Sequence, residues 1–103
     1  SGEESKSGVS PDEAKGLVAI CEMLPNVSVR GFMTMAPQGD LDVAARCFSG
    51  LSELAREVRA SLPAESAAAF NELSMGMSED WREAVRAGAT IVRIGRAIFS
   101  DHF

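Results

Sequence analysis

The residues best suited to chemistry lie in the stretch SMGMS, residues 74–78, between a predicted strand and a predicted helix. The first N–H groups of a helix have no partner inside it, and its dipole favours negative charge there. Gly76 lets the backbone approach a ligand closely, and the flanking serines add hydroxyl donors. The pattern predicts an anion-binding turn. An ordinary capped turn is the alternative, and the acids Glu79 and Asp80 count against an anion unless they point away from it.

A second segment, TIVRIG at residues 90–95, places one arginine among β-branched residues. Burying a guanidinium inside a sheet costs free energy unless it is paired. A carboxylate such as Glu72 and an anionic ligand could each pair with Arg93, and the pattern leaves both open. Gly95 follows at the carboxyl end of the predicted strand, the end at which α/β barrels bind ligands and often phosphate. Two glycine-bearing strand ends in succession, with an arginine beside the second, indicate a phosphate-bearing ligand.

The remaining reactive residue types do not form a recognisable catalytic or metal site. Cys21 and Cys47 lack the Cys/His spacing of a metal site, and we expect reduced thiols of a cytosolic protein. His102, the single histidine, lies beside the C-terminus, where a solvated side chain is expected. Lys6 and Lys15 are the only lysines, and neither lies on a predicted strand. We therefore expect no catalytic residue and no metal ion in this chain.

Composition narrows the class of protein further. The 103 residues suffice for one domain, and 46% hydrophobic with 24% charged residues is typical of a globular chain. A net charge of −5 argues against a nucleic-acid surface, which needs clustered Lys and Arg. No hydrophobic run approaches the ~20 residues that span a bilayer, and residues 1–9 do not read as a signal peptide. We expect a cytoplasmic protein without membrane association.

Hydrophobic spacing and capping residues predict alternating helices and strands. Ser10 and Glu13 form a capping box with proline at the first helical position. Asp40 is the predicted N-cap of a second helix, and Ser78 and Gly88 bound a third. The predicted elements are helix 10–24, strand 27–37, helix 40–62, a small-residue connection 63–69, strand 70–75, helix 79–87 and strand 90–99.

This alternation predicts βα units, hence an α/β fold with a parallel sheet and right-handed crossovers. A parallel sheet is normally covered on both faces or closed into a barrel. Three predicted strands make a thin sheet. We therefore expect the chain to be the second half of a larger unit.

The stretch LSMGMSEDWREAVRAGATIVRIGRAIF resembles the C-terminal signature of the pyridoxal-phosphate homeostasis protein family, whose barrel is shared with the N-terminal domain of alanine racemase. SKSGV and VRGFMTMAP are also similar to later segments of that family, so the resemblance covers nearly all of the chain. It implies a fold of the (β/α)8 TIM-barrel type that binds pyridoxal 5′-phosphate, the cofactor PLP, and acts in cofactor balance without an established reaction. The chain would be the last three βα units of that barrel, with residues 1–103 as its C-terminal half.

The resemblance also implies a set of site residues. Ser74 and Gly76 match the turn that holds the cofactor phosphate, and Arg93 matches an arginine near the phosphate and the pyridine ring. Gly95 and Arg96 match the loop whose backbone closes round the same phosphate. The full implied cofactor-binding set is Ser74, Met75, Gly76, Ser78, Arg93, Gly95 and Arg96.

The chain departs from the family in one respect. The family's Schiff-base lysine lies on an early strand, and neither Lys6 nor Lys15 matches it. The resemblance thus implies a PLP carrier of which this chain supplies the phosphate-binding half, contacting the phosphate moiety alone. A fragment of a racemase-type enzyme is the alternative, although the sequence has no tyrosine to act as a second base. Expected partners are PLP or a phosphate or sulfate anion, with self-association through exposed half-barrel surface.

Overall fold

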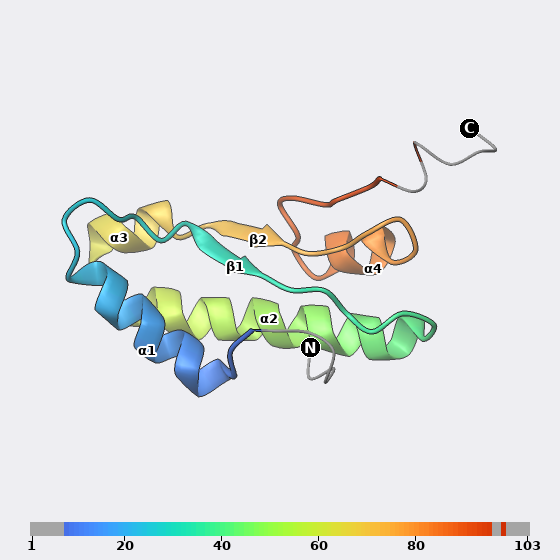
Figure 1. Ribbon diagram of the computed structural model, residues 1–103, viewed down its shortest axis with the longest axis horizontal. Coiled ribbons are helices and arrows are strands. Elements are labelled where there is room, and N and C mark those ends of the chain that lie inside the picture. Colours follow the sequence, from blue (N-terminus) through green and yellow to red (C-terminus); the bar gives the residue numbers. More distant parts are fainter. Residues whose placement is uncertain (1–7, 96–97, 99–103) are drawn as a thin grey trace.

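The computed structural model describes residues 8–95 and residue 98 as an α/β arrangement of helices around two parallel strands (Figure 1). The elements in chain order are α1 (Pro11–Glu22), β1 (Gly31–Met33), α2 (Leu41–Ser61), α3 (Ala64–Ala69), β2 (Glu72–Ser74) and α4 (Trp81–Arg86). The predicted order of helices and strands is confirmed as far as β2 and α4. The prediction that 63–69 is only a connection is wrong, because its small residues form α3.

The two longer helices begin where their capping residues predict. The Glu13 N–H donates to Ser10 Oγ at 3.2 Å, and the Ser10 N–H donates to the Glu13 carboxylate at 3.3 Å, which completes the capping box. Asp40 caps α2 by accepting from the N–H of Asp42 at 2.9 Å. These caps satisfy N–H groups that have no partner inside the helix.

The strands are shorter than predicted. Only Gly31–Met33 of the predicted strand 27–37 pairs with β2, in the register Gly31 to Glu72 and Met33 to Ser74. The predicted strand 90–99 is reduced to a single parallel bridge between Ser74 and Ile91 within the described part, and its residues 96, 97 and 99 lie outside that part.

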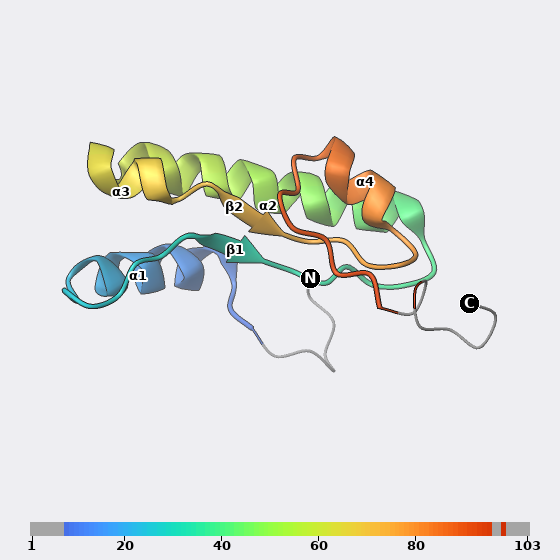
Figure 2. The same ribbon diagram turned by 90° about the horizontal axis from the view of Figure 1, so that it is seen from above.

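Helices α1 and α2 both lie below the strands in the view of Figure 1, and side chains of the strands, α1 and α2 contribute to the buried core. Figure 2 shows the same elements from above. One cluster of buried side chains centres on Phe48 of α2 and Met75. A second joins Val18, Val58 and Phe70, and Phe70 meets Phe32 of β1 edge to face at a ring separation of 5.1 Å. The other face of the strands is bare: Met33 is 60% exposed and Ile91 43% exposed.

Helix α2 is amphipathic, with buried Ala44, Phe48 and Val58 on one face. Charged residues occupy the other face, where Arg56 pairs with Glu53 at 3.2 Å. Within residues 8–95 and 98, none of the helices combines the length and the apolar character that crossing a bilayer requires.

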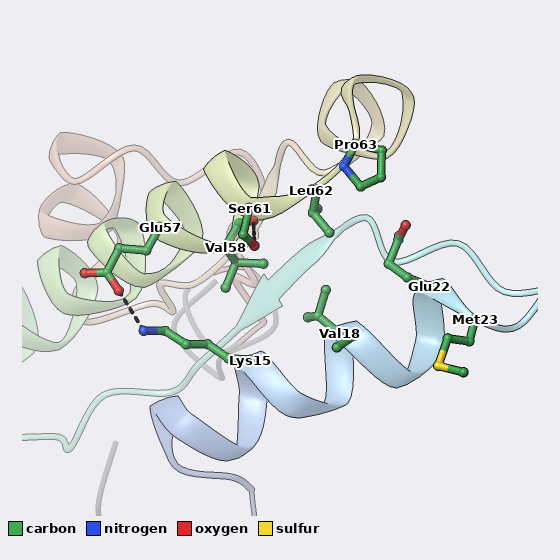
Figure 3. A pocket seen from close by; sticks show the side chains of 10 residues that line it. Lys15, Val18, Glu22, Met23, Glu57, Val58, Ser61, Leu62 and Pro63 are labelled. Atoms are coloured by element: carbon green, nitrogen blue, oxygen red, sulfur yellow. Dashed lines mark hydrogen bonds and ion pairs between the residues drawn. The ribbon is translucent and has the colours of Figure 1, made fainter.

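A pocket of about 520 Å³ lies between α1 and α2 (Figure 3). Its lining is largely aliphatic, with Val18, Val58 and Leu62 among the contributors. The Lys15 ammonium bridges the two helices at its rim by pairing with Glu57 at 3.0 Å. The pocket is large, but none of the predicted site residues lines it, so size does not mark it as the site.

The Lys15–Glu57 pair gives a pH-dependent contribution to stability. The hydrogen bond to Glu57, followed by the charge of Glu57, raises the pKa of Lys15 above its usual value of 10.5. A raised folded-state pKa stabilises the fold below the unfolded pKa and loses that effect as pH rises through the folded value. We expect a small effect, because both side chains are about half exposed.

Urea unfolding at about pH 9 and about pH 11.5 measures this contribution. The chain should lose slightly more stability over this interval than a Lys15→Met variant does. Equal losses of unfolding free energy in the two proteins would show that the Lys15–Glu57 pair does not couple α1 to α2.

Candidate functional site

Three of the predicted site residues, Ser78, Arg93 and Gly95, line a cavity at the carboxyl ends of three neighbouring segments: β1, β2 and the extended segment 90–94. This strand-end cavity has a volume of about 280 Å³. Its lining residues are Ala36, Gln38, Met77, Ser78, Glu79, Asp80, Arg93 and Gly95. Parallel α/β folds place ligands at this end of their strands, because the loops that follow the strands converge there.

The turn that connects β2 to α4 forms one wall of the cavity. Asp80, which is only 7% exposed, accepts a hydrogen bond from the Met77 N–H at 2.8 Å through Oδ1. The Asp80 N–H donates back to the Met77 carbonyl at 3.2 Å, so the two residues are joined twice. The prediction that Ser78 caps the helix is wrong: α4 begins at Trp81 after Asp80, and Asp80 makes no side-chain cap bond.

Gly76 allows this turn to pack tightly on α4. Its φ of +103° lies in the left-handed region. A Cβ at this position would lie 2.6 Å from the Ala84 Cβ and 3.2 Å from the Trp81 Cα. The close approach that Gly76 permits is therefore to helix α4, in addition to any approach to a ligand.

Arg93 crosses the strand ends. Its backbone N–H donates to the Gly76 carbonyl at 2.9 Å, and its Nη2 donates to the Thr34 carbonyl beyond β1 at 2.8 Å. The carboxylate of Glu72, one of the two partners left open by the sequence, does not pair with it in the described part of the chain. Its Nε is buried and has no hydrogen-bond partner there.

An orphaned guanidinium N–H is costly, because it has lost water without gaining another acceptor. Arg93 lines the cavity, and no carboxylate among the described residues pairs with it.

Several predicted site residues lie elsewhere. The Met75 side chain is fully buried in the core, and its N–H already donates to the Ile91 carbonyl at 3.0 Å. Ser74 ends β2 and bridges to Ile91, outside the cavity lining. Arg96 lies outside the described residues. Ser78, Arg93 and Gly95 are the predicted residues that the cavity brings together.

The cavity also includes residues that the sequence reasoning missed. Ala36 and Gln38 follow β1, and Met77 and Asp80 come from the turn before α4. The available signal was the Pro-Gln-Gly turn after the first predicted strand, because parallel strands end at one edge of the sheet. Among residues 8–95 and 98, no group of three or more His, Cys, Asp or Glu side chains is placed to hold a metal ion.

Comparisons with known proteins extend this picture. Residues 1–102 match the family model described as the N-terminal domain of alanine racemase. The pyridoxal phosphate homeostasis protein of Vibrio cholerae is 41% identical over an alignment of 103 positions, which covers 98% of this chain and 41% of that protein. The chain thus spans about two fifths of the length of the curated relatives that it matches.

Solved structures agree with the sequence matches. PipY of Synechococcus elongatus without PLP superposes with a TM-score of 0.84 at 32% identity, over 95% of this chain and 45% of that one. The PLP-bound structure of PipY gives a TM-score of 0.81 at 32% identity, over 93% and 44%. The family match over residues 1–102 shows that the chain belongs to the alanine racemase N-terminal domain family, and the curated relatives to which it is similar are pyridoxal phosphate homeostasis proteins.

Proposed function

We propose that this chain binds the phosphate group of pyridoxal 5′-phosphate in the strand-end cavity. The observation that carries the proposal is the Arg93 guanidinium, which lines this cavity and forms no ion pair with a described carboxylate. Its Nη2 is held by the Thr34 carbonyl at 2.8 Å, so the group is fixed in place before any ligand arrives. A fixed cation with an unsatisfied donor is suited to a phosphate oxygen.

The dimensions of the cavity support binding of one end of the cofactor. Pockets that enclose a whole small molecule have volumes of roughly 300–1,000 Å³. At about 280 Å³ the strand-end cavity lies just below that range. A volume of this size accommodates a phosphate group with part of the attached ring.

The similar proteins support the choice of cofactor and of architecture. The relatives are named as pyridoxal phosphate homeostasis proteins, and PipY has been solved with PLP bound. In a (β/α)8 barrel, helices cover the outer face of the strands and ligands bind at their carboxyl ends. The bare strand face that carries Met33 and Ile91 would be the inner face of such a barrel, with residues 1–103 as its C-terminal half.

Within this proposal each residue has a stated role. Arg93 supplies the positive charge, while Ser78 and the backbone near Gly95 line the space around the phosphate. Gly76 keeps the turn against α4 and accepts from the Arg93 N–H. When bound, PLP brings an aldehyde that reacts with amines, and these residues hold and orient the molecule without taking part in that chemistry.

The role that follows is to store and deliver PLP inside the cell. The competing proposal is that the chain is a fragment of a racemase-type enzyme. An assay of a full-length parent protein with L-alanine distinguishes the carrier role from the enzymatic one. Sustained formation of D-alanine would contradict the carrier role.

Replacing Arg93 tests the site itself. Hydrogen bonds to charged groups contribute about 1.5–3 kcal/mol, so Arg93→Met should weaken binding of inorganic phosphate about 10- to 100-fold. The exposed Arg56, which lies on α2 and pairs with Glu53, provides the matched control. Arg56→Met should leave phosphate affinity unchanged, and an equally small effect of both substitutions would contradict the proposal.

Competition identifies which part of the cofactor binds. Pyridoxal 5′-phosphate should displace inorganic phosphate from the chain, whereas pyridoxal, which lacks the phosphate, should not. Displacement by both would place the main contacts on the ring.

A further inference from the structure

We propose that Asp80 is a positioning residue that shapes the wall of the strand-end cavity and also limits how tightly the cavity holds an anion. The inference rests on the proposed phosphate site and concerns a residue outside the site set that the sequence predicts. Asp80 is the buried charged side chain among the described residues, with 7% of its surface exposed. It lines the same cavity as Arg93 and Gly95.

The first function of Asp80 is structural. Its Oδ1 accepts from the Met77 N–H at 2.8 Å, and its own N–H donates to the Met77 carbonyl at 3.2 Å. Its carbonyl then accepts from the Ala84 N–H at 3.2 Å, which starts the hydrogen bonds of α4. One residue thus connects the turn to the helix and fixes the part of the cavity wall that the turn forms.

The second function follows from the charge. The ion pairs among the described residues are Lys15–Glu57, Arg56–Glu53 and Arg86–Glu83, so no described cation neutralises Asp80 directly. A carboxylate in the lining of a cavity repels an incoming phosphate, and the repulsion is strengthened where the site is partly shielded from water. Arg93 attracts the same phosphate. Glu79 also lines the cavity. The balance of these carboxylates against Arg93 would give moderate affinity, which suits a protein that must release its cofactor.

The Met77 hydrogen bond and the charge can be separated by substitution. Asp80→Asn keeps an oxygen that can accept from the Met77 N–H but removes the charge. Asp80→Ser also keeps an oxygen acceptor and removes the charge, with a shorter side chain. It replaces the asparagine variant in the test if that variant fails to fold. Asp80→Ala removes both the acceptor and the charge. Asp42→Asn, at an exposed position in the first turn of α2, is the matched control for the loss of one carboxylate.

The test titrates each folded protein with inorganic phosphate and follows the fluorescence of Trp81, the single tryptophan, which directly follows Asp80. Asp80→Asn should bind phosphate about tenfold more tightly than the unmodified chain at low ionic strength, and the gain should shrink as salt is added. Asp42→Asn should not differ from the unmodified chain. A role in shape alone predicts no gain for Asp80→Asn.

Amide hydrogen exchange reports the structural part separately. The Met77 amide should exchange about tenfold faster or more in Asp80→Ala and at nearly the original rate in Asp80→Asn. If the unmodified chain binds phosphate and Asp80→Asn binds no more tightly, the inference about Asp80 fails while the proposed function stands. If neither protein binds phosphate, the proposed function fails and this inference fails with it.

Discussion

Gly31→Ala is expected to cost about 3 kcal/mol of unfolding free energy or more and to lower the melting temperature by roughly 10 °C or more. A Cβ at residue 31 would lie 1.7 Å from the carbonyl oxygen of Glu72 and 2.6 Å from its carbonyl carbon. The obstacle is backbone and cannot rotate away. The two strands would have to separate, which would break the bonds from the Asn71 and Glu72 N–H groups to the Arg30 carbonyl.

Gly50→Ala is the matched control. Gly50 lies within α2, and a Cβ there would meet nothing within 4 Å. Alanine in a helix interior is favoured over glycine by about 0.5–1 kcal/mol, so this variant should be slightly more stable. Thermal unfolding followed by circular dichroism compares the two. If the Gly31→Ala variant had the same melting temperature as the unmodified chain, β1 and β2 would not pair as described.

Gly76→Ala is the second substitution with a large expected effect, about 2–5 kcal/mol of unfolding free energy. Two costs contribute. A φ of +103° is unfavourable for alanine, and the new Cβ would lie 2.6 Å from the Ala84 Cβ. Moving α4 outward to relieve this overlap would shift the turn whose carbonyl accepts from the Arg93 N–H. The affinity for inorganic phosphate should therefore fall together with stability.

Gly88→Ala separates the two costs. Gly88 has a φ of +107°, but a Cβ there would have its nearest neighbour, the Ser52 Oγ, at 3.8 Å. This variant should lose only the backbone term of about 1–2 kcal/mol and should keep its phosphate affinity. Urea unfolding and phosphate titration of both variants test the pair. Equal losses of unfolding free energy and of phosphate affinity in Gly76→Ala and Gly88→Ala would mean that contact with α4 does not constrain the turn.

The positions of Gly31 and Gly76 indicate that the packing of β1, β2 and α4 determines the geometry of the candidate site. Gly31 sets the spacing of the strands and Gly76 sets the distance from the turn to the last helix. The cavity lies where these elements end. Substitutions in the interior of the fold can therefore change anion binding without touching the cavity lining.

The sequence alone determined the features that depend on neighbouring residues. The capping box of Ser10 and Glu13 and the cap at Asp40 follow from hydrogen bonds between residues two or three positions apart. The amphipathic spacing of α2 likewise predicts its buried face. The family resemblance rests on contiguous motifs, and the match over residues 1–102 confirms it.

Other features depend on contacts that no local pattern contains. Residues 63–69 resemble a loop because they are small, and the helix α3 that they form is supported from outside: Arg59 of α2 donates to the Ala67 carbonyl at 3.1 Å, and Arg30 donates to the Ala69 carbonyl at 3.3 Å. The predicted strand lengths were too great because alternating apolar residues show which segments can pair, but not how far a partner continues beside them.

Only the tertiary structure decided which site residues act together. Arg93 contacts the Thr34 carbonyl from 59 residues away, a partner that the spacing around TIVRIG does not reveal. Met75 and Ser78 belong to one short motif, yet the first lies in the core and the second lines the cavity. Burial depends on how α4 packs across the strand ends. A local sequence pattern can therefore predict an anion-binding turn, but the set of side chains that faces the anion is determined by packing between distant segments.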